Sequence, residues 1–186
     1  MEGASHPQEL VFRAHELGYA ALALTDRCSL AGVVRAHEEA KALNLHLIVG
    51  AELQIDSGPR LVALAQTREG YGNLSELISR ARRRANKGQY RLLLEDLDEG
   101  LLDCLLLWLP QRERAQDEIL PQGRWLLEHL AGRLWIGVVL HRRGGDGAWL
   151  ARLQHLGEAL GLPLAACGGV AMHSAARRPV LDTLTA

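Results

Sequence analysis

Four polar residues stand where predicted strands end, and their types could serve metal chemistry. They are Asp26, Glu52, His141 and His173. Carboxylates and imidazoles bind the metal ions that activate water for hydrolysis, and such centres need several of these ligands together. Side chains from different strands would converge at the C-terminal rim of a barrel. The simpler alternative is that the two carboxylates cap helix N-termini and that the two histidines are surface residues.

A dense group of basic residues offers a second kind of chemistry. It comprises Arg80, Arg82, Arg83, Arg84 and Lys87. In a helix, Arg80, Arg83 and Arg84 lie on one side, because residues three and four positions apart are neighbours. That side could contact DNA phosphates. The alternative is a solvated helix face, which we favour because no aromatic residues for base stacking are interleaved with the arginines.

Composition places the chain among ordinary globular proteins. Of its 186 residues, 48% are hydrophobic and 23% charged, and the net charge of −1 provides no global attraction for nucleic acid. Cys28, Cys104 and Cys167 are far apart and form no C-x-x-C motif, which argues against a zinc knuckle and favours a reducing compartment. No signal peptide or membrane-spanning run is present in the sequence. We therefore expect a cytoplasmic protein without a membrane partner.

Short apolar runs alternate with helical patterns along the chain. The runs predict strands at residues 19–25, 45–53, 61–65, 103–109, 134–140 and 164–167. Helices are predicted between them, with N-caps that include Ser5, Ser29, Asn73 and Asp146. This alternation predicts a parallel sheet covered by helices, either open and doubly wound or closed as a (β/α) barrel. The lack of a glycine-rich phosphate-binding motif after the first strand weakens the doubly wound alternative.

Several short motifs in order resemble one family. They are LALTDRCSLAGVVRAH at 22–37, LIVGAEL at 47–53, GYGNLSEL at 70–77, LPLAACGGVAMH at 162–173 and the run from 177 to 186. Together they resemble the polymerase and histidinol phosphatase (PHP) domain, in the form found in bacterial error-prone DNA polymerases related to the polymerase III alpha subunit. The resemblance implies a distorted (β/α)7, TIM-like barrel in which residues 1–186 form one domain. It also implies that the first strand of the barrel, with its His-rich motif, is missing and that the chain is a fragment of a larger polymerase.

The same resemblance implies a degenerate metal site. Active members carry an Asp-His pair where this chain has Asp26-Arg27, and an Asp-x-His motif where it has residues 169–171, Gly-Val-Ala. Glu52 matches the family's bridging glutamate, whereas Asp26 and His173 are weaker remnants of the ligand set. One carboxylate cannot hold a hydrolytic metal cluster, so no cofactor is expected for the fragment.

The function implied is that of a PHP domain in an error-prone polymerase that acts in damage-induced mutagenesis and translesion synthesis. Magnesium is implied for the parent polymerase, with DNA, other polymerase domains and mutasome proteins as partners. The fragment alone is expected to be inactive, because its Asp-x-Asp pair, Asp96 and Asp98, is predicted to face solvent on a polar turn rather than to form a catalytic palm. The alternatives are a stand-alone metal-dependent phosphoesterase of the same superfamily and a purely structural docking module.

Overall fold

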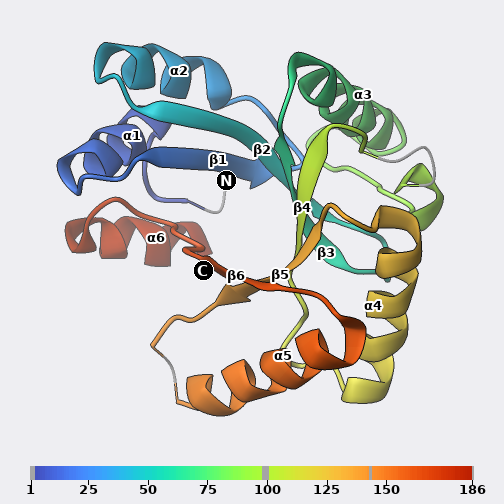
Figure 1. Cartoon of the computed structure of the whole chain (residues 1–186). Coiled ribbons are helices and arrows are strands. Elements are labelled where there is room, and N and C mark those ends of the chain that lie inside the picture. Colours follow the sequence, from blue (N-terminus) through green and yellow to red (C-terminus); the bar gives the residue numbers. More distant parts are fainter. Residues whose placement is uncertain (1–2, 98–100, 143, 186) are drawn as a thin grey trace.

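A curled, mixed sheet of six strands organises the chain. The computed structural model describes residues 3–97, 101–142 and 144–185. The strands follow the order β1-β2-β3-β4-β5-β6 and comprise Ala21–Arg27, His46–Gln54, Arg60–Ala65, Cys104–Trp108, Leu134–Val139 and Leu164–Cys167. Figure 1 shows the curl, with β1 and β6 at the two edges of the sheet. This half-barrel is the distorted TIM-like architecture that the resemblance implied.

The third strand departs from the predicted parallel arrangement. β1 and β2 are parallel, as are β4, β5 and β6, but β3 is antiparallel to both β2 and β4. The reason is the short connection at residues 55–59, which is too short for the crossover that a parallel neighbour needs. Within this turn Ser57 has φ 55° and the Gly58 amide donates to the Ile55 carbonyl over 3.0 Å. The all-parallel prediction was therefore wrong at β3.

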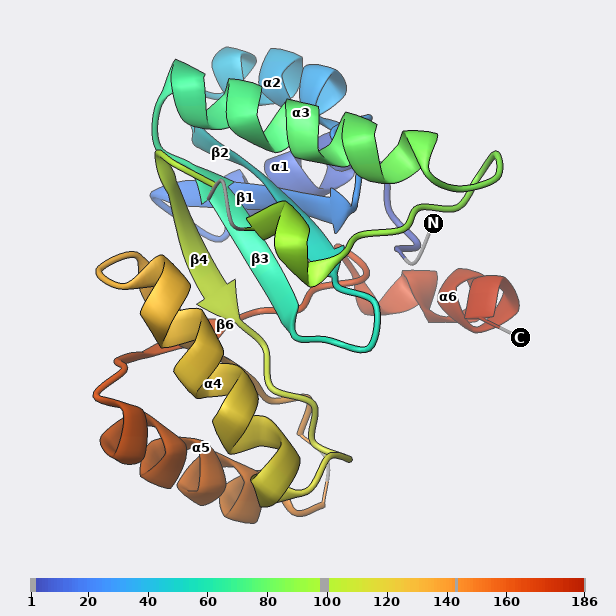
Figure 2. The ribbon, with the colours of Figure 1, turned by 90° about the vertical axis from the view of Figure 1, so that its right-hand side faces the viewer.

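The longer helices lie along the outer side of the sheet, whereas the helix at residues 178–185 lies at its open side (Figure 1). The α-helices are α1 (Pro7–Glu16), α2 (Val33–Ala42), α3 (Arg68–Arg83), α4 (Gln116–Leu130), α5 (Asp146–Leu160) and α6 (Arg178–Thr185). Short 3-10 helices η1 (Leu94–Leu97) and η2 (Ala175–Arg177) occur in the connections. Figure 2 shows α4 and α5 together on one part of the sheet, whereas α1 packs against α2 and α3 lies along β2, β3 and β4. Within the described ranges, no helix is long and apolar enough to cross a membrane.

The hydrophobic core lies between the sheet and these helices. On β4, Cys104, Leu106 and Trp108 are buried, whereas the alternating residues Leu105 and Leu107 are only half-buried. Alternation of this kind means that one face of the strand packs on helices and the other faces the hollow of the curled sheet.

Helix α3 begins earlier than its predicted cap. Thr67 is the N-cap, and its side chain accepts a hydrogen bond from the Gly70 amide over 3.1 Å. Asn73 was predicted to cap this helix but lies within its second turn, where its side chain donates to the Leu102 carbonyl over 3.0 Å. The apolar residues Leu74, Leu77 and Ala81, spaced as on one side of a helix, are buried. The hydrophobic period was thus the better guide to this helix than its capping residue.

Candidate functional site

The two predicted carboxylate ligands lie in neighbouring strands but on opposite faces of the sheet. Arg27 of β1 pairs with Glu52 of β2, whereas Asp26 pairs with Ala51. Paired residues share a face and successive residues alternate, so Asp26 and Glu52 point in opposite directions. Asp26 faces the start of α2, because a Cβ added to Gly32 would lie 2.8 Å from its Oδ2 atom. Asp26 lies within β1, which corrects the predicted end of that strand at residue 25, and Glu52 lies within β2 as predicted.

An arginine stands beside Glu52 on the hollow side of the sheet. The Arg60 Nε atom of β3 lies 3.8 Å from Glu52 Oε1, and 21% of the Glu52 side chain is exposed. Arg60 comes from the strand that pairs antiparallel with β2, so the hairpin brings the two together. Arg27 is on the same face and donates to the Tyr90 hydroxyl over 3.3 Å. The surroundings of this candidate ligand are therefore cationic, which opposes a second positive charge from a metal ion.

His173 connects two distant parts of the chain. Its Nδ1 atom lies 2.8 Å from Ser5 Oγ, and its backbone amide donates to the same oxygen over 2.9 Å. Glu9 lies between His173 and Arg177: its Oε2 is 3.7 Å from His173 Nδ1, and its Oε1 accepts a hydrogen bond from the Arg177 guanidinium. A hydrogen bond from the His6 amide, reinforced by Arg177, holds the pKa of Glu9 below its ordinary value against the opposing effect of burial. His6, rather than the predicted Ser5, is the N-cap of α1.

These positions do not fit the metal site that the family implies. Within the part of the chain that the structure describes, no three His, Cys, Asp or Glu side chains lie together so that they could hold a metal ion. Asp26 and Glu52 diverge, and His173 is engaged by Ser5. His141 follows β5 and lies near Gly169, at which a Cβ would come 3.3 Å from the imidazole Cε1 atom. The described residues therefore supply scattered polar groups rather than a ligand set.

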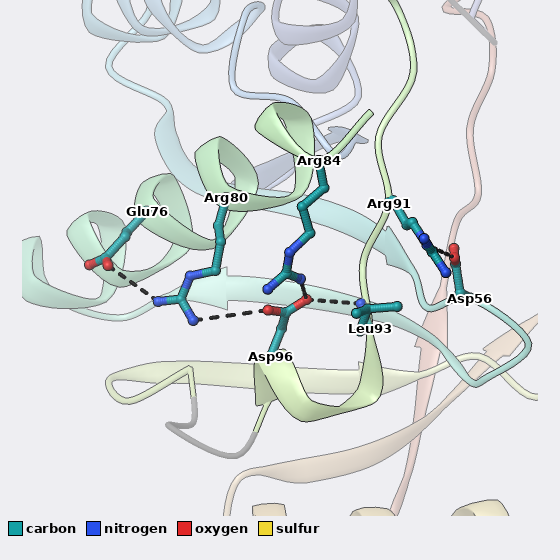
Figure 3. A network of polar contacts seen from close by, with 7 residues as sticks. All are labelled: Asp56, Glu76, Arg80, Arg84, Arg91, Leu93 and Asp96. Carbon is teal, nitrogen blue, oxygen red and sulfur yellow. Dashed lines mark hydrogen bonds and ion pairs between the residues drawn. The ribbon is translucent and has the colours of Figure 1, made fainter. Parts of the chain in front are cut away.

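The basic face of α3 holds a buried carboxylate. Asp96 of η1 accepts hydrogen bonds from the Arg84 guanidinium and, over 2.9 Å, from the Leu93 amide. Arg80 lies 3.9 Å from the other oxygen of Asp96 and donates to Glu76 over 3.2 Å (Figure 3). Only 1% of the Asp96 side chain is exposed. The prediction that Asp96 faces solvent was wrong, because two arginines compensate its burial; Asp98 lies outside the described residues.

The arginines of the cluster therefore divide into different environments. Arg80 and Arg84 of the predicted DNA contact face η1, whereas Arg83 is exposed. Sequence reasoning missed the role of Arg82. Its guanidinium donates to the Cys28 carbonyl over 3.1 and 2.9 Å and to the Gly88 and Gln89 carbonyls over 3.3 Å each. Spacing alone carried no signal for this role, since the accepting Cys28 lies far away in sequence.

The cysteines have the environment of structural residues. Burial raises the pKa of the Cys28 and Cys167 thiols and raises that of Cys104 to about 11. The Cys104 thiol donates to the Gly70 carbonyl over 3.4 Å and has no exposed surface. A nucleophilic thiol requires a lowered pKa and access to solvent.

Comparison with known proteins places this geometry in a family. The model of the PHP domain family matches residues 1–123. The chain is 55% identical over 187 aligned residues to an error-prone DNA polymerase of Methylococcus capsulatus, covering 100% of the chain and 18% of that polymerase. It is 50% identical to an error-prone DNA polymerase of Pseudomonas aeruginosa, covering 99% of the chain and 17% of that protein. The chain thus spans less than a fifth of the length of these relatives.

Solved structures show the same fold at low sequence identity. A candidate metal-dependent phosphoesterase from Bifidobacterium adolescentis matches with a TM-score of 0.63 and 13% identity, over 93% of this chain and 84% of that one. An amidohydrolase from Chromobacterium violaceum, solved with sulfate and without metal, matches with a TM-score of 0.64 and 16% identity, over 91% and 84% of the two chains. The family model, which matches well over half of the chain, and the curled sheet lead to one conclusion: the chain belongs to the PHP domain family.

Proposed function

We propose that this chain is the PHP domain of an error-prone DNA polymerase and that the domain has a structural rather than a catalytic role. The observation that carries the proposal is the 55% identity over the whole chain to an error-prone DNA polymerase of which it covers 18%. The reaction of such a protein is magnesium-dependent, template-directed nucleotidyl transfer in the cytoplasm. Its biological setting is DNA replication past damage, with DNA repair and induced mutagenesis as consequences.

The geometry of the strand ends supports the structural role. Glu52 is compensated by Arg60, and Asp26 points to the other face of the sheet. Hydrolysis of a phosphate ester by metal ions requires converging ligands that leave an open coordination position. The described residues provide no such group. The domain would then contribute a folded framework for the neighbouring polymerase domains.

Contact with DNA, if this domain makes one, would rely on Arg83 more than on its neighbours. Arg80 and Arg84 compensate the buried Asp96, so their guanidinium groups are committed within the domain. In the complete polymerase, Arg83→Ala should make the slope of log affinity against log salt shallower by about one unit if Arg83 binds a phosphate. An unchanged slope would assign the exposed end of α3 to solvent or to a protein partner such as a mutasome component.

Primer extension opposite an abasic site tests the proposal. The complete polymerase that contains this chain should extend the primer with magnesium, whereas the 186-residue chain alone should not. Glu52→Gln in the complete protein should leave extension unchanged, because the carboxylate faces Arg60 and no metal ligand set. Loss of extension in this variant, with the fold intact by circular dichroism, would contradict a structural role.

A metal-dependent phosphoesterase is the second candidate. It is favoured by the fold shared with the Bifidobacterium protein and by the position of Glu52 in the sheet. Hydrolysis of p-nitrophenyl phosphate by the chain with manganese or zinc, combined with elemental analysis, distinguishes the two functions. Two or more tightly held ions per chain together with turnover would favour the phosphoesterase.

A further inference from the structure

A set of polar contacts spans the open side of the curled sheet. The contacts join the segment that precedes and begins α1 to the segment that follows β6. We define the rim latch as Ser5, Glu9, His173 and Arg177. The two members of each pair are separated by 168 positions in the sequence, so the contacts are tertiary and not local. Both views place the N-terminal stretch near the segment that leads into α6 (Figures 1 and 2).

The latch consists of two coupled pairs. Ser5 Oγ accepts the His173 amide over 2.9 Å and lies 2.8 Å from His173 Nδ1, so one side chain holds both the backbone and the ring of its partner. Glu9 accepts from Arg177 through Oε1 and from the His6 amide through Oε2 over 2.8 Å. The two oxygens of Glu9 are thus each engaged. A backbone hydrogen bond from the Ala4 amide to the Ala171 carbonyl, 2.8 Å long, lies beside them.

The position of the latch matters because β1 and β6 are the edges of the sheet. Each edge strand has one neighbour in the described sheet, and the two do not pair with each other. Ser5 and Glu9 precede β1, whereas His173 and Arg177 follow β6. The contacts therefore cross between the two edges at the end of the sheet where β6 finishes. Arg177 also directly precedes α6, so its ion pair ties the residue before that helix to the first turn of α1.

The charges of the latch oppose metal binding. A divalent ion here would displace Arg177 from Glu9 or lie close to its guanidinium, at a cost in electrostatic energy. The same arrangement recurs at Glu52, whose carboxylate faces Arg60. Arginine guanidinium groups therefore stand next to both Glu9 and Glu52. Each pair balances charge without a cation from solution.

We propose that the rim latch of Ser5, Glu9, His173 and Arg177 closes the open side of the sheet in place of a metal cluster. The N-terminal segment and the segment that leads into α6 are then held by these side-chain contacts and the Ala4–Ala171 backbone hydrogen bond, without a bound ion. The shape of this part of the domain is accordingly independent of metal supply. This inference concerns stability and does not depend on the polymerase function proposed above.

Thermal unfolding of the 186-residue chain tests the latch directly. Dialysis against EDTA should shift the melting temperature by less than about 1 °C, whereas Arg177→Gln should lower it by about 2–4 °C. Glu9→Gln should have a similar effect, because the amide oxygen keeps the cap on His6 but the charge is lost. The double variant with Glu9→Gln and Arg177→Gln should lower the melting temperature no more than the more damaging single variant does, because the two residues are members of one pair. Arg177→Lys should recover part of the loss, since it restores the charge with a single donor centre.

The control for these variants is an exposed ion pair on α1, the helix that also carries Glu9. Arg13 and Glu16 of α1 form an ion pair of 3.0 Å with 45% and 44% of their side chains exposed. Arg13→Gln should change the melting temperature by less than about 1 °C, because exposed pairs contribute little. Equal effects of Arg13→Gln and Arg177→Gln would contradict the latch. A large loss of stability in EDTA, or an increase with added zinc or manganese, would also overturn the proposal.

Hydrogen exchange shows where the molecule opens and remains informative if Arg177→Gln is too unstable to analyse. In Ser5→Ala, the amide of His173 loses its acceptor and should exchange about tenfold faster, together with the amide of Ala4. Amides of β3 and β4 in the middle of the sheet should be unaffected. Faster exchange throughout the sheet would indicate general destabilisation, and no local change would show that the latch does not hold the two segments; either result would overturn the proposal.

Discussion

The carboxylate of Asp96 in η1 is held against the guanidinium of Arg84 at the end of α3, with 1% of the aspartate and 34% of the arginine side chain exposed. Asp96 also accepts a hydrogen bond from the Leu93 amide, so it stabilises the turn that contains it as well as the contact with α3. A carboxylate this buried is stabilised only by its partners. The contact therefore ties the segment after α3 back onto that helix.

Asp96→Asn should lower the free energy of unfolding by about 2 kcal/mol, because the charge-assisted bond to Arg84 is lost while the shape of the side chain is kept. Urea denaturation measures the change. Asp56→Asn is the control, since the pair of Asp56 and Arg91 is 46% and 62% exposed. Asp56→Asn should lower the free energy of unfolding by less than about 1 kcal/mol. Equal losses in the two variants would show that burial of Asp96 contributes nothing beyond a surface ion pair.

Arg82 should be the arginine of α3 that the fold needs most for its backbone hydrogen bonds. Arg82→Ala removes donors to the Cys28, Gly88 and Gln89 carbonyls and a guanidinium 5.3 Å from the centre of the Tyr90 ring. We expect a loss of about 2 kcal/mol in the free energy of unfolding. Arg82→Lys should recover little of it, because a lysine cannot donate in several fixed directions. Arg83→Ala is the matched control and should stay within about 0.5 kcal/mol.

Much of the fold could be predicted from local pattern, because burial on one or two faces leaves a period in the sequence. The six apolar runs all became strands, and the stripe of Leu74, Leu77 and Ala81 is buried. The direction of β3 could not be obtained from its composition, since a continuous apolar run is compatible with parallel and antiparallel neighbours. The signal lay in the connection at residues 55–59, whose shortness and turn residues exclude a crossover.

The site was less predictable, because its chemistry depends on pairs that are distant in sequence. Asp96 is acidic on a short turn, and nothing local indicates that Arg80 and Arg84 would bury it. The strand register also decides the fate of the two candidate ligands: a difference of one position places Asp26 and Glu52 on opposite faces. In both cases the direction of the side chain depends on tertiary contacts and strand register, which the local sequence does not contain.

The Cys104 thiol should make stability depend on pH in the alkaline range. Burial raises its pKa from the ordinary 9.0 to about 11. Between these values the unfolded chain loses the thiol proton while the folded chain keeps it. The contribution of this thiol to the free energy of unfolding is therefore fully present below pH 9. It is lost as the pH rises to 11 and does not change further above that pH. The loss in the free energy of unfolding should approach about 3 kcal/mol.

Cys104→Ser supplies the comparison for this titration. A serine hydroxyl can still donate to the Gly70 carbonyl but does not ionise in this range. The difference in unfolding free energy between the two proteins, measured in urea at pH 8 and pH 10.5, should shrink at the higher pH as the natural protein is destabilised. A constant difference would mean that Cys104 ionises equally in the folded and unfolded chains.

Two glycines of α3 should respond in opposite directions to the same substitution. A Cβ on Gly70 would lie 2.2 Å from the Asp103 carbonyl oxygen, whereas a Cβ on Gly72 would meet nothing within 4 Å. Gly70→Ala should therefore cost about 1–3 kcal/mol, because the helix must move away from the start of β4. Gly72→Ala should raise the free energy of unfolding by about 0.5–1 kcal/mol, because alanine restricts the unfolded chain and favours a helix. Chemical denaturation of both variants compares them within one helix. A gain in stability from Gly70→Ala would show that α3 does not pack against the Asp103 backbone as closely as the structure has it.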